Sequence, residues 1–397
     1  MKRKYLTLVA SIVIMLCIGG VYAWSTFVKP LIDNYNLTNA QTQIVFGFTI
    51  AVFSIVMILA GKIEKKYGPK ICTLAGMVLF VTGYLIASIS NGNIFLIIAG
   101  IGVLSGAGIG FCYISALISP VKCFPNKKGL ITGIAAAGFG GGAIILSNIV
   151  ELLLVKKIDV LEIFSYIGLV YGMIILISLF FLSSPKIEEN SENVSEKNIM
   201  ILFKDRILLG LFFGMFAGTF AGLLVIGNLK PIGMSSGVSE TMATLGISLF
   251  ALGNMIGRVL WGYVSDKLKD KTAIILSLIF LTVSTLALTI VTWHGVLFLI
   301  ISLAIGLCFG ANFVLYAKAV SHTYGAHNLG LIYPYIFLAY GLAGLTGPTT
   351  GGELFDITQT YTLSIIVSAV ICVVGIIIYR YLAKGAAEIS VSNIKPE

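Results

Sequence analysis

Long apolar segments recur along the whole chain and constrain its fold more than any other feature of the sequence. Each segment has about 18 residues or more, enough for an α-helix to cross about 30 Å of hydrocarbon. We predict an all-α membrane protein in which twelve helices span the bilayer. The predicted spans are residues 5–28, 40–60, 71–90, 94–119, 129–150, 163–182, 205–228, 240–263, 272–291, 295–318, 328–350 and 358–382.

The composition agrees with this prediction. Of the 397 residues, 58% are hydrophobic and 11% are charged, whereas soluble domains carry about 25% charged residues. The first span follows Lys2, Arg3 and Lys4, as the apolar core of a signal peptide would. Its apolar run is longer than that of a signal peptide and no small-residue cleavage site follows it, so we expect it to be retained as a helix.

The distribution of basic residues predicts the orientation in the membrane. If both termini are cytoplasmic, 21 of the 26 Lys and Arg residues fall on the cytoplasmic side, and four, Lys29, Lys156, Lys157 and Lys230, fall on the outer side. The remaining one is Arg258. This bias satisfies the positive-inside rule, so the net charge of +9 indicates topology rather than nucleic-acid binding. We expect a multi-pass protein of the cell membrane with both termini cytoplasmic.

A polar stretch divides the spans into two groups of six. It begins "SSPKIEENSENVSEKN" at Ser183 and contains no long apolar run, a composition that suits a solvated cytoplasmic linker. We predict a six-helix bundle at residues 1–182, a linker at residues 183–204, and a second six-helix bundle with a short tail at residues 205–397.

The two groups repeat each other's sequence features. "GKIEKKYGPK" follows the second span and "GYVSDKLKDK" follows the eighth, which is its equivalent. The fifth span carries "GIAAAGFGGGA" from Gly133 and the eleventh "GLAGLTGPTTGG" from Gly341. Small residues at such spacing let helices approach closely, either for packing alone or for rocking of one helix against another. Duplicated halves predict a carrier whose site lies between them near the middle of the bilayer.

The loops after the second and eighth spans resemble the loop motif of the major facilitator superfamily, Gly-x-Leu-x-Asp-Arg-x-Gly-Arg-Lys. The usual Asp is replaced by Lys65 in the first loop, with Glu64 beside it. The resemblance implies the twelve-helix fold of that superfamily and a gating role for the matching residues. The departure at Lys65 weakens the expected charge interactions of the first loop. The matching residues are Gly61, Gly68, Lys70, Gly262 and Asp266.

Three other stretches resemble one family within this superfamily, the oxalate–formate antiporters. They are "GGVYAWSTFVKPL" in the first span, "CFPNKKGLITGIAAAGFGGG" entering the fifth, and "GRVLWGYVSDK" closing the eighth. The similarity runs across most of the chain at comparable spacing. It implies a transporter of small carboxylates that uses no cofactor.

Arg258 lies within the eighth span, eight residues before Asp266 and thus about 12 Å away along a helix. A cation inside a span costs ~2.5–3.5 kcal/mol on insertion scales and commonly faces a cavity. The alternative is a side chain that extends to the membrane surface, for which 12 Å is long. The family resemblance implies that this Arg binds the substrate carboxylate, and a guanidinium can hold a carboxylate through two parallel hydrogen bonds.

The oxalate carriers of the resembled family use a second cation, a Lys of the eleventh span. Here residues 329–351 contain no Lys or Arg, and Ile336 or a near neighbour occupies that position. A dianion facing one cation would be half compensated, whereas a monoanion would be matched. We therefore predict formate, acetate, lactate or a similar monocarboxylate in preference to oxalate.

Aromatic and polar residues of other spans are further candidates for the substrate site. Tyr22, Tyr113 and Tyr333 match cavity-lining aromatic positions of the resembled family, while for the others lipid contact or packing between helices is an open alternative. The candidates besides Arg258 are Tyr22, Trp24, Tyr113, Asn312, Tyr333 and Tyr335.

The positions of the acidic residues bear on coupling. All 17 Asp and Glu fall in loops, tails or span ends, and Glu151 and Glu353 are the nearest to being buried. Proton-coupled carriers often contain a carboxylate inside the membrane, and related monocarboxylate–proton symporters carry Asp at the position of Asn254. We therefore favour exchange or uniport.

Other classes of protein fit less well. The six cysteines are not spaced as metal ligands, and no nucleophile–base set or phosphate loop points to an enzyme. Three alternatives stay open: an oxalate–formate antiporter, an exporter of lipophilic compounds, which the run "GLTGPTTGG" mildly favours, and a transporter-like nutrient sensor. We expect a monomer in a lipid bilayer, with a small organic anion as substrate and no metal or cofactor.

Overall fold

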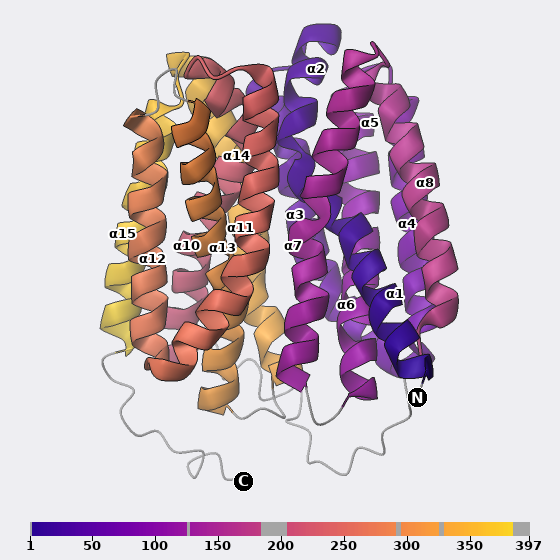
Figure 1. Cartoon of the computed structure of the whole chain (residues 1–397), viewed down its shortest axis with the longest axis vertical. Coiled ribbons are helices and arrows are strands. Elements are labelled where there is room, and N and C mark those ends of the chain that lie inside the picture. The colour runs from indigo at the N-terminus through magenta and orange to yellow at the C-terminus, as the bar shows by residue number, and fades with distance from the viewer. Residues whose placement is uncertain (1, 125–127, 184–204, 291–294, 325–328, 384–397) are drawn as a thin grey trace.

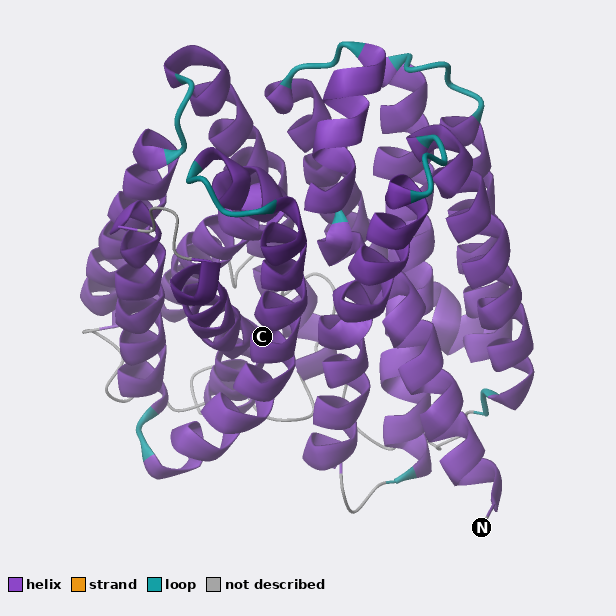
Figure 2. Cartoon of the chain, turned by 45° about the horizontal axis from the view of Figure 1, so that its top comes forward, coloured by secondary structure: helices purple, strands orange, loops and turns teal. Residues whose placement is uncertain are grey.

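Helices account for almost all of the described chain (Figure 2). The structure is a computed structural model, and it describes residues 2–124, 128–183, 205–290, 295–324 and 329–383. These residues contain no β-strand, so the predicted all-α fold is confirmed. The predicted linker lies outside the described residues except for Ser183.

Polar caps fix the starts of several helices in the first bundle. The Thr38 hydroxyl accepts a hydrogen bond from the Gln41 backbone N–H, and the Gln41 side chain accepts one from the Thr38 N–H, which stabilises the first turn of a helix. The elements are α1 (Lys2–Gly19), η1 (Gly20–Ala23), α2 (Ser25–Tyr35), α3 (Asn39–Tyr67), α4 (Pro69–Ser88), α5 (Ile94–Ile97), η2 (Ile98–Ser105), α6 (Gly106–Cys123), α7 (Lys128–Val155) and α8 (Val160–Phe181).

The second bundle is built in the same way. The Asp205 side chain caps one helix and the Ser239 side chain the next, each accepting a hydrogen bond from a backbone N–H of the first turn. The elements are α10 (Arg206–Ser235), α11 (Glu240–Lys267), α12 (Asp270–Leu286), η5 (Ala287–Ile290), α13 (Gly295–Tyr324), α14 (Leu329–Thr358) and α15 (Thr362–Leu382).

The prediction of twelve spans is confirmed for eleven of them. Eleven segments of the described chain are long and apolar enough to cross a membrane. The twelfth, α14, has 30 residues, as do α10 and α13, and it lies among the other helices in Figure 1.

Several predicted spans differ from the observed helices in length or regularity, three of them as follows. The first is interrupted by the 3₁₀ turn η1 and continues as α2 to Tyr35, beyond the predicted end at residue 28. The fourth contains the π-helical stretch η2, and α14 extends to Thr358 rather than residue 350. These extensions are polar, so apolarity alone did not reveal them.

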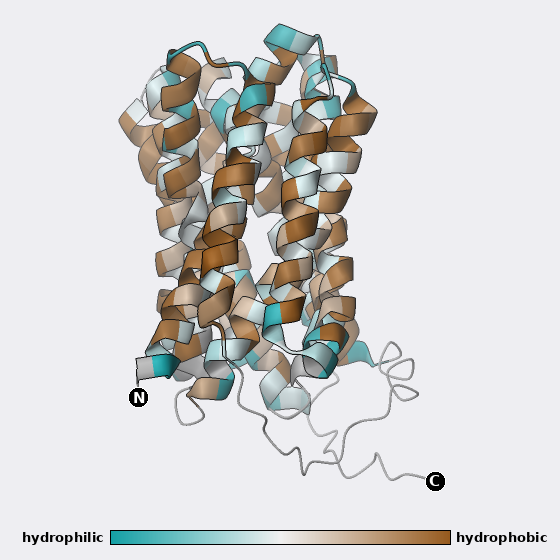
Figure 3. Ribbon diagram, turned by 90° about the vertical axis from the view of Figure 1, so that its right-hand side faces the viewer, coloured by the Kyte–Doolittle hydropathy of each residue, from teal (hydrophilic) through white to brown (hydrophobic). Residues whose placement is uncertain are grey.

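The two bundles stand side by side with their helices roughly parallel to one long axis (Figure 1). Apolar residues predominate along the middle of the helices and polar residues gather at the ends (Figure 3). The start of α1 and the end of α15 lie at the same end of the molecule. We call the opposite end the distal end, which the charge bias predicts to be outside the cell. The bundles meet chiefly where α7 contacts α11 and α3 contacts α14.

The loop motif of the first bundle lies at the end near the termini. Gly68 joins α3 to α4 with φ at 83°, a conformation that glycine adopts without strain. The Lys70 ammonium donates to the Phe180 carbonyl of α8 at 3.0 Å. A Cβ atom added at Gly61 or Gly262 would meet only ordinary van der Waals contacts, and the Asp266 side chain is not among those described.

Lys65 replaces the usual Asp of the loop motif, and we therefore expected weak charge interactions in the first loop. Glu64, the residue before it, supplies such an interaction instead. Its carboxylate is 2% exposed and accepts from the Lys122 ammonium of α6 at 3.2 and 3.3 Å. In the second bundle the Lys318 ammonium donates to the Ser265 hydroxyl at 3.1 Å. Glu64 and Ser265 each follow the first glycine of their loop by three residues, so the two contacts are equivalent. The first loop therefore keeps an ion pair, within one bundle.

Candidate functional site

Close packing of α11 on α13 fixes the position of Arg258. A Cβ atom added at Gly253 would lie 2.3 Å from the Leu303 carbonyl oxygen, and one at Gly257 would lie 2.2 Å from that of Leu307. The two backbones can approach this closely only because both positions are glycine. Arg258 directly follows this contact, so its backbone is held against a rigid neighbour.

The Arg258 side chain crosses to the other bundle. Its Nη1 donates to the Ala136 carbonyl of α7 at 2.9 Å, and its Nε donates to Asn254 Oδ1 at 3.2 Å. The guanidinium lies over the Phe313 ring, 4.3 Å from its centroid. Arg258 is 2% exposed, so the side chain is buried between the bundles rather than extended to the membrane surface.

The charge of Arg258 has no acidic partner among the residues that the structure describes. Its Nη2 and the neighbouring Asn254 Nδ2 are buried and make no hydrogen bond to any of them. A cation–π contact stabilises a buried cation by about 2 kcal/mol, less than the several kcal/mol that burial of an ion costs. The positive charge of Arg258, its unused Nη2 and the unused Asn254 Nδ2 together form a site suited to an anion.

The small residues of α7 face two different neighbours. A Cβ atom added at Gly140 would meet Met255 and Asn254 of α11 at 3.5 to 3.6 Å, an ordinary contact. On another face of α7, a Cβ atom at Gly142 would lie 2.3 Å from the Leu16 carbonyl oxygen of α1. The run from Gly133 therefore serves packing within the first bundle on one face and admits Asn254 and Arg258 on another.

Aromatic rings from both bundles surround the guanidinium. The Tyr22 and Tyr340 hydroxyl groups share a hydrogen bond of 2.8 Å between η1 and α14, and Tyr113 packs edge-on against Phe139 at 5.2 Å. The Arg258 charge is close enough to interact with the hydroxyl groups of four tyrosines, Tyr22, Tyr113, Tyr333 and Tyr340. The other rings of the cluster are Phe53, Phe139, Phe309, Phe313 and Phe337.

The structure brings Tyr22, Tyr113 and Tyr333 together with Arg258, but it places Trp24 and Asn312 elsewhere. Trp24 donates to the Thr42 carbonyl and stacks on Phe164 within the first bundle. Asn312 turns toward α10, where a Cβ atom at Gly218 would lie 2.3 Å from its Oδ1. Tyr335 follows Tyr333 by two residues, and residues at this spacing do not share a helix face.

Two expectations about charged residues need correction. Lys230, expected in an outer segment, lies within α10 and is 0% exposed. Glu353, expected to be among the most buried acids, is exposed, whereas Glu64 is 2% exposed. The apolar run of α10 continues past Lys230 to Ile232, and this was the signal that could have placed Lys230 inside the span.

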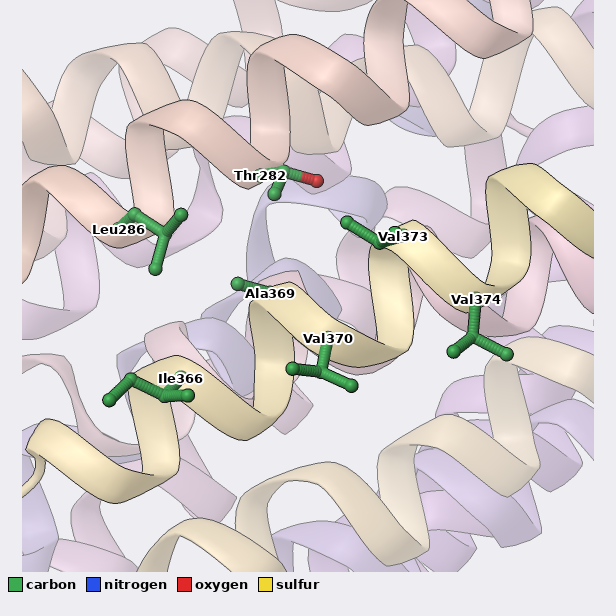
Figure 4. A pocket seen from close by; sticks show the side chains of 7 residues that line it. All are labelled: Thr282, Leu286, Ile366, Ala369, Val370, Val373 and Val374. Atoms are coloured by element: carbon green, nitrogen blue, oxygen red, sulfur yellow. The ribbon is translucent and has the colours of Figure 1, made fainter.

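An apolar groove lies between α12 and α15, and Arg258 is not among the residues that line it (Figure 4). Its volume is about 260 Å³, and several of its side chains are about half exposed on the outside of the helices, where the bilayer would surround them. Among the described residues no cluster of His, Cys, Asp or Glu could hold a metal ion. The groove is lined by Thr282, Leu286, Ile366, Ala369, Val370, Val373 and Val374.

Two six-helix bundles that span a bilayer, with a buried cation and polar groups between them, define a membrane transporter. A sequence profile of the Major Facilitator Superfamily matches residues 9–333 and 211–395 of the chain. The chain therefore belongs to the major facilitator superfamily, and it is a transporter rather than an enzyme.

Individual relatives are similar at low sequence identity. The oxalate:formate antiporter of Oxalobacter formigenes is 27% identical over 89% of this chain and 85% of its own length. Monocarboxylate transporter 12 of Xenopus laevis is 26% identical over 77% of this chain and 72% of its own. A bacterial homologue of the human lysosomal transporter Spinster, solved in an inward-facing and unoccupied conformation, has a TM-score of 0.72 and 14% identity. That structure covers 96% of this chain with 97% of its own length and shares its fold.

Proposed function

We propose that the protein transports small organic anions by alternating access, and that it carries monocarboxylates of the formate, acetate or lactate type. The observation behind this proposal is the state of Arg258, which is buried between the bundles with no acidic partner among the described residues and with Nη2 unused. A carboxylate would supply both the missing charge and the missing acceptors. Relatives named for oxalate, formate and monocarboxylate transport support the same class of substrate.

The surroundings of Arg258 favour a single negative charge. No second cation contacts the aromatic cluster, within the part of the chain that is described. Ile336, which itself or through a near neighbour corresponds to the Lys of the resembled antiporters, is fully buried. The Asn254 amide and the tyrosine hydroxyl groups are neutral donors, so they can hold carboxylate oxygens without a second charge. A dianion such as oxalate would keep one charge uncompensated in a site of low dielectric constant.

Exchange or uniport fits these residues better than coupling to a proton on a side chain at the site. Asn254, which accepts the hydrogen bond from Arg258, does not titrate. The substrate itself then supplies the only carboxyl group that we assign to the site. The charge bias supports both termini on the cytoplasmic side, and therefore a distal end that faces outward.

The test is substrate-induced thermal stabilisation of the purified protein with formate, lactate and oxalate. We expect formate or lactate to stabilise the wild type more than oxalate does. Arg258→Gln should lower carboxylate affinity about 100-fold or more, since it removes two charge-assisted hydrogen bonds. Arg258→Lys keeps the charge without the planar fork, so it should recover part of the affinity. A folded Arg258→Gln variant with carboxylate affinity near that of the wild type would refute this function.

A further inference from the structure

A second buried cation between the bundles is already bound to a carboxylate of the protein itself. The Lys230 ammonium of α10 is 2.7 Å from Glu151 Oε2, and the Thr244 hydroxyl of α11 donates to the same oxygen at 3.0 Å. The Lys230 side chain is 1% exposed and that of Glu151 18%. Both donors belong to the second bundle, whereas Glu151 belongs to α7 of the first.

Separation of the bundles at the distal end would leave these two donors in place. α10 and α11 move together because they belong to one bundle, and α7 would carry the Glu151 carboxylate away. An ammonium and a hydroxyl, preset to hold one carboxylate oxygen, would then face the opening between the bundles. Glu151 thus occupies the position that a carboxylate from solution could take.

Glu240 keeps this position close to electrical neutrality. Its Oε1 lies 3.1 Å from Lys230 Nζ, and its Oε2 lies 3.9 Å from Lys29 Nζ of the first bundle. The Lys29–Glu240 pair is more than 40% exposed on both sides and contributes little to closure. Because Glu240 and Lys230 remain paired in the second bundle, Lys230 is never left alone, and an anion would bind there weakly enough to leave again.

Polar side chains lie between this position and Arg258 along the contact of α7 and α11. Ser147 and Ser248 bring their hydroxyl oxygens to 3.4 Å, and Asn148 Nδ2 donates to the Ser248 hydroxyl at 2.8 Å. Thr244 and Arg258 are 14 residues apart on α11, which corresponds to about 21 Å. A small monocarboxylate cannot span that distance, so the two positions would be separate sites.

We propose that Lys230 and Thr244 form a second, distal carboxylate-binding site, which Glu151 occupies while the bundles are closed and which the substrate enters when they separate. The proposal rests on the proposed function, since it assumes a carboxylate substrate. Exchange of one carboxylate for another at Lys230 would let substrate at the distal side compete with one of the contacts that hold this side closed, beside those of Asn39 and Ala40 with Asp356.

The test compares the half-saturating lactate concentration on each side of proteoliposomes that contain the full-length protein in one orientation. Thr244→Val removes one donor and should raise the value on the distal side about 5- to 10-fold, as expected for one lost hydrogen bond. The value on the side of the termini should not change. Thr244→Ser keeps the hydroxyl and should behave as the wild type.

Glu240→Gln provides the decisive contrast, because it acts on the same ammonium with the opposite sign. When Glu151 moves away, the Glu240→Gln variant has no other carboxylate beside Lys230, so the ammonium attracts the substrate more strongly. The half-saturating lactate concentration on the distal side should therefore fall at least about 3-fold. A purely structural ion pair predicts no such opposite effects. The distal site would be overturned if each variant changed the half-saturating lactate concentration equally on both sides. It would also be overturned if neither variant changed that concentration on the distal side.

The outcome for the distal site can be separated from that for Arg258. If lactate stabilises the wild type and Arg258→Gln abolishes that stabilisation, the proposed function holds whatever the distal variants do. If lactate and formate do not stabilise the wild type, the proposed function fails, and the distal site fails with it.

Discussion

At the scale of single residues, two buried cations between the bundles have opposite surroundings. Lys230 is bound by the carboxylates of Glu151 and Glu240, whereas Arg258 has a carbonyl, an amide and an aromatic ring. A buried ion without a counter-charge is costly, so evolution retains such an ion only where something offsets that cost. For Arg258 we assign that role to the substrate, which explains why its Nη2 is unused in the protein alone.

Ile336 offers a test of how charge selects the substrate. It lies three residues after Tyr333 and four before Tyr340 on α14, so it shares a helix face with both. Ile336→Lys would add a second cation beside the aromatic cluster. We expect affinity for oxalate relative to formate to rise about 10-fold, which corresponds to one added charge-assisted hydrogen bond.

The measurement for Ile336→Lys is thermal stabilisation by each anion, with Ile336→Met as the control that keeps the position apolar. The control should retain the wild-type preference. If Ile336→Lys folds and its preference is also unchanged, the position does not face the substrate, and the charge of the anion is selected elsewhere.

At the scale of helices, glycines decide which contacts are rigid and which have room to move. α11 and α13 touch backbone to backbone at Gly253 and Gly257, where any side chain would clash. The contact of α7 with α11 is looser, since Gly140 has space for a Cβ atom. The tight contact of α11 with α13 lies within a bundle, and the looser contact of α7 with α11 lies between the bundles. The other main contact between the bundles is close, since a Cβ atom added at Gly47 of α3 would lie 2.9 Å from the Leu345 Cα of α14.

Gly257→Ala tests this division of roles. The added Cβ atom would lie 2.2 Å from the Leu307 carbonyl oxygen, so α11 must shift from α13 and carry Arg258 with it. We expect a loss of about 1–3 kcal/mol in stability and weaker carboxylate binding, both measured by thermal unfolding with and without lactate. Gly262→Ala on the same helix meets only Val314 at 3.5 Å and should leave both quantities unchanged.

At the scale of the whole molecule, apolarity predicted the helices well because each had to span a bilayer. It also placed Arg258 in the membrane, since one cation in an apolar run stands out. The sequence could not show that Trp24 and Asn312 turn away from Arg258, because both depend on how helices rotate about their axes. Nor did it reveal the pairing of Lys230 with Glu151, since these residues are 79 positions apart and the ion pair forms only when the bundles meet.

The last prediction concerns the movement of the two bundles. Transport by alternating access requires α7 and α11 to separate at the distal end, and Ser147 and Ser248 lie on either side of that contact with their hydroxyl oxygens 3.4 Å apart. A Ser147→Cys/Ser248→Cys double variant should therefore form a disulfide under mild oxidation and lose exchange of lactate across proteoliposome membranes. A reducing agent should restore it.

Each single cysteine variant, treated with the same oxidant, should keep its activity. This control matters because the chain has six free cysteines of its own, of which Cys123 is the least buried. Since the disulfide would hold the distal end closed without touching Arg258, lactate should still stabilise the cross-linked protein. Full exchange by the cross-linked protein would mean that the bundles need not separate along α7 and α11, and the substrate would then have to enter along another contact between them.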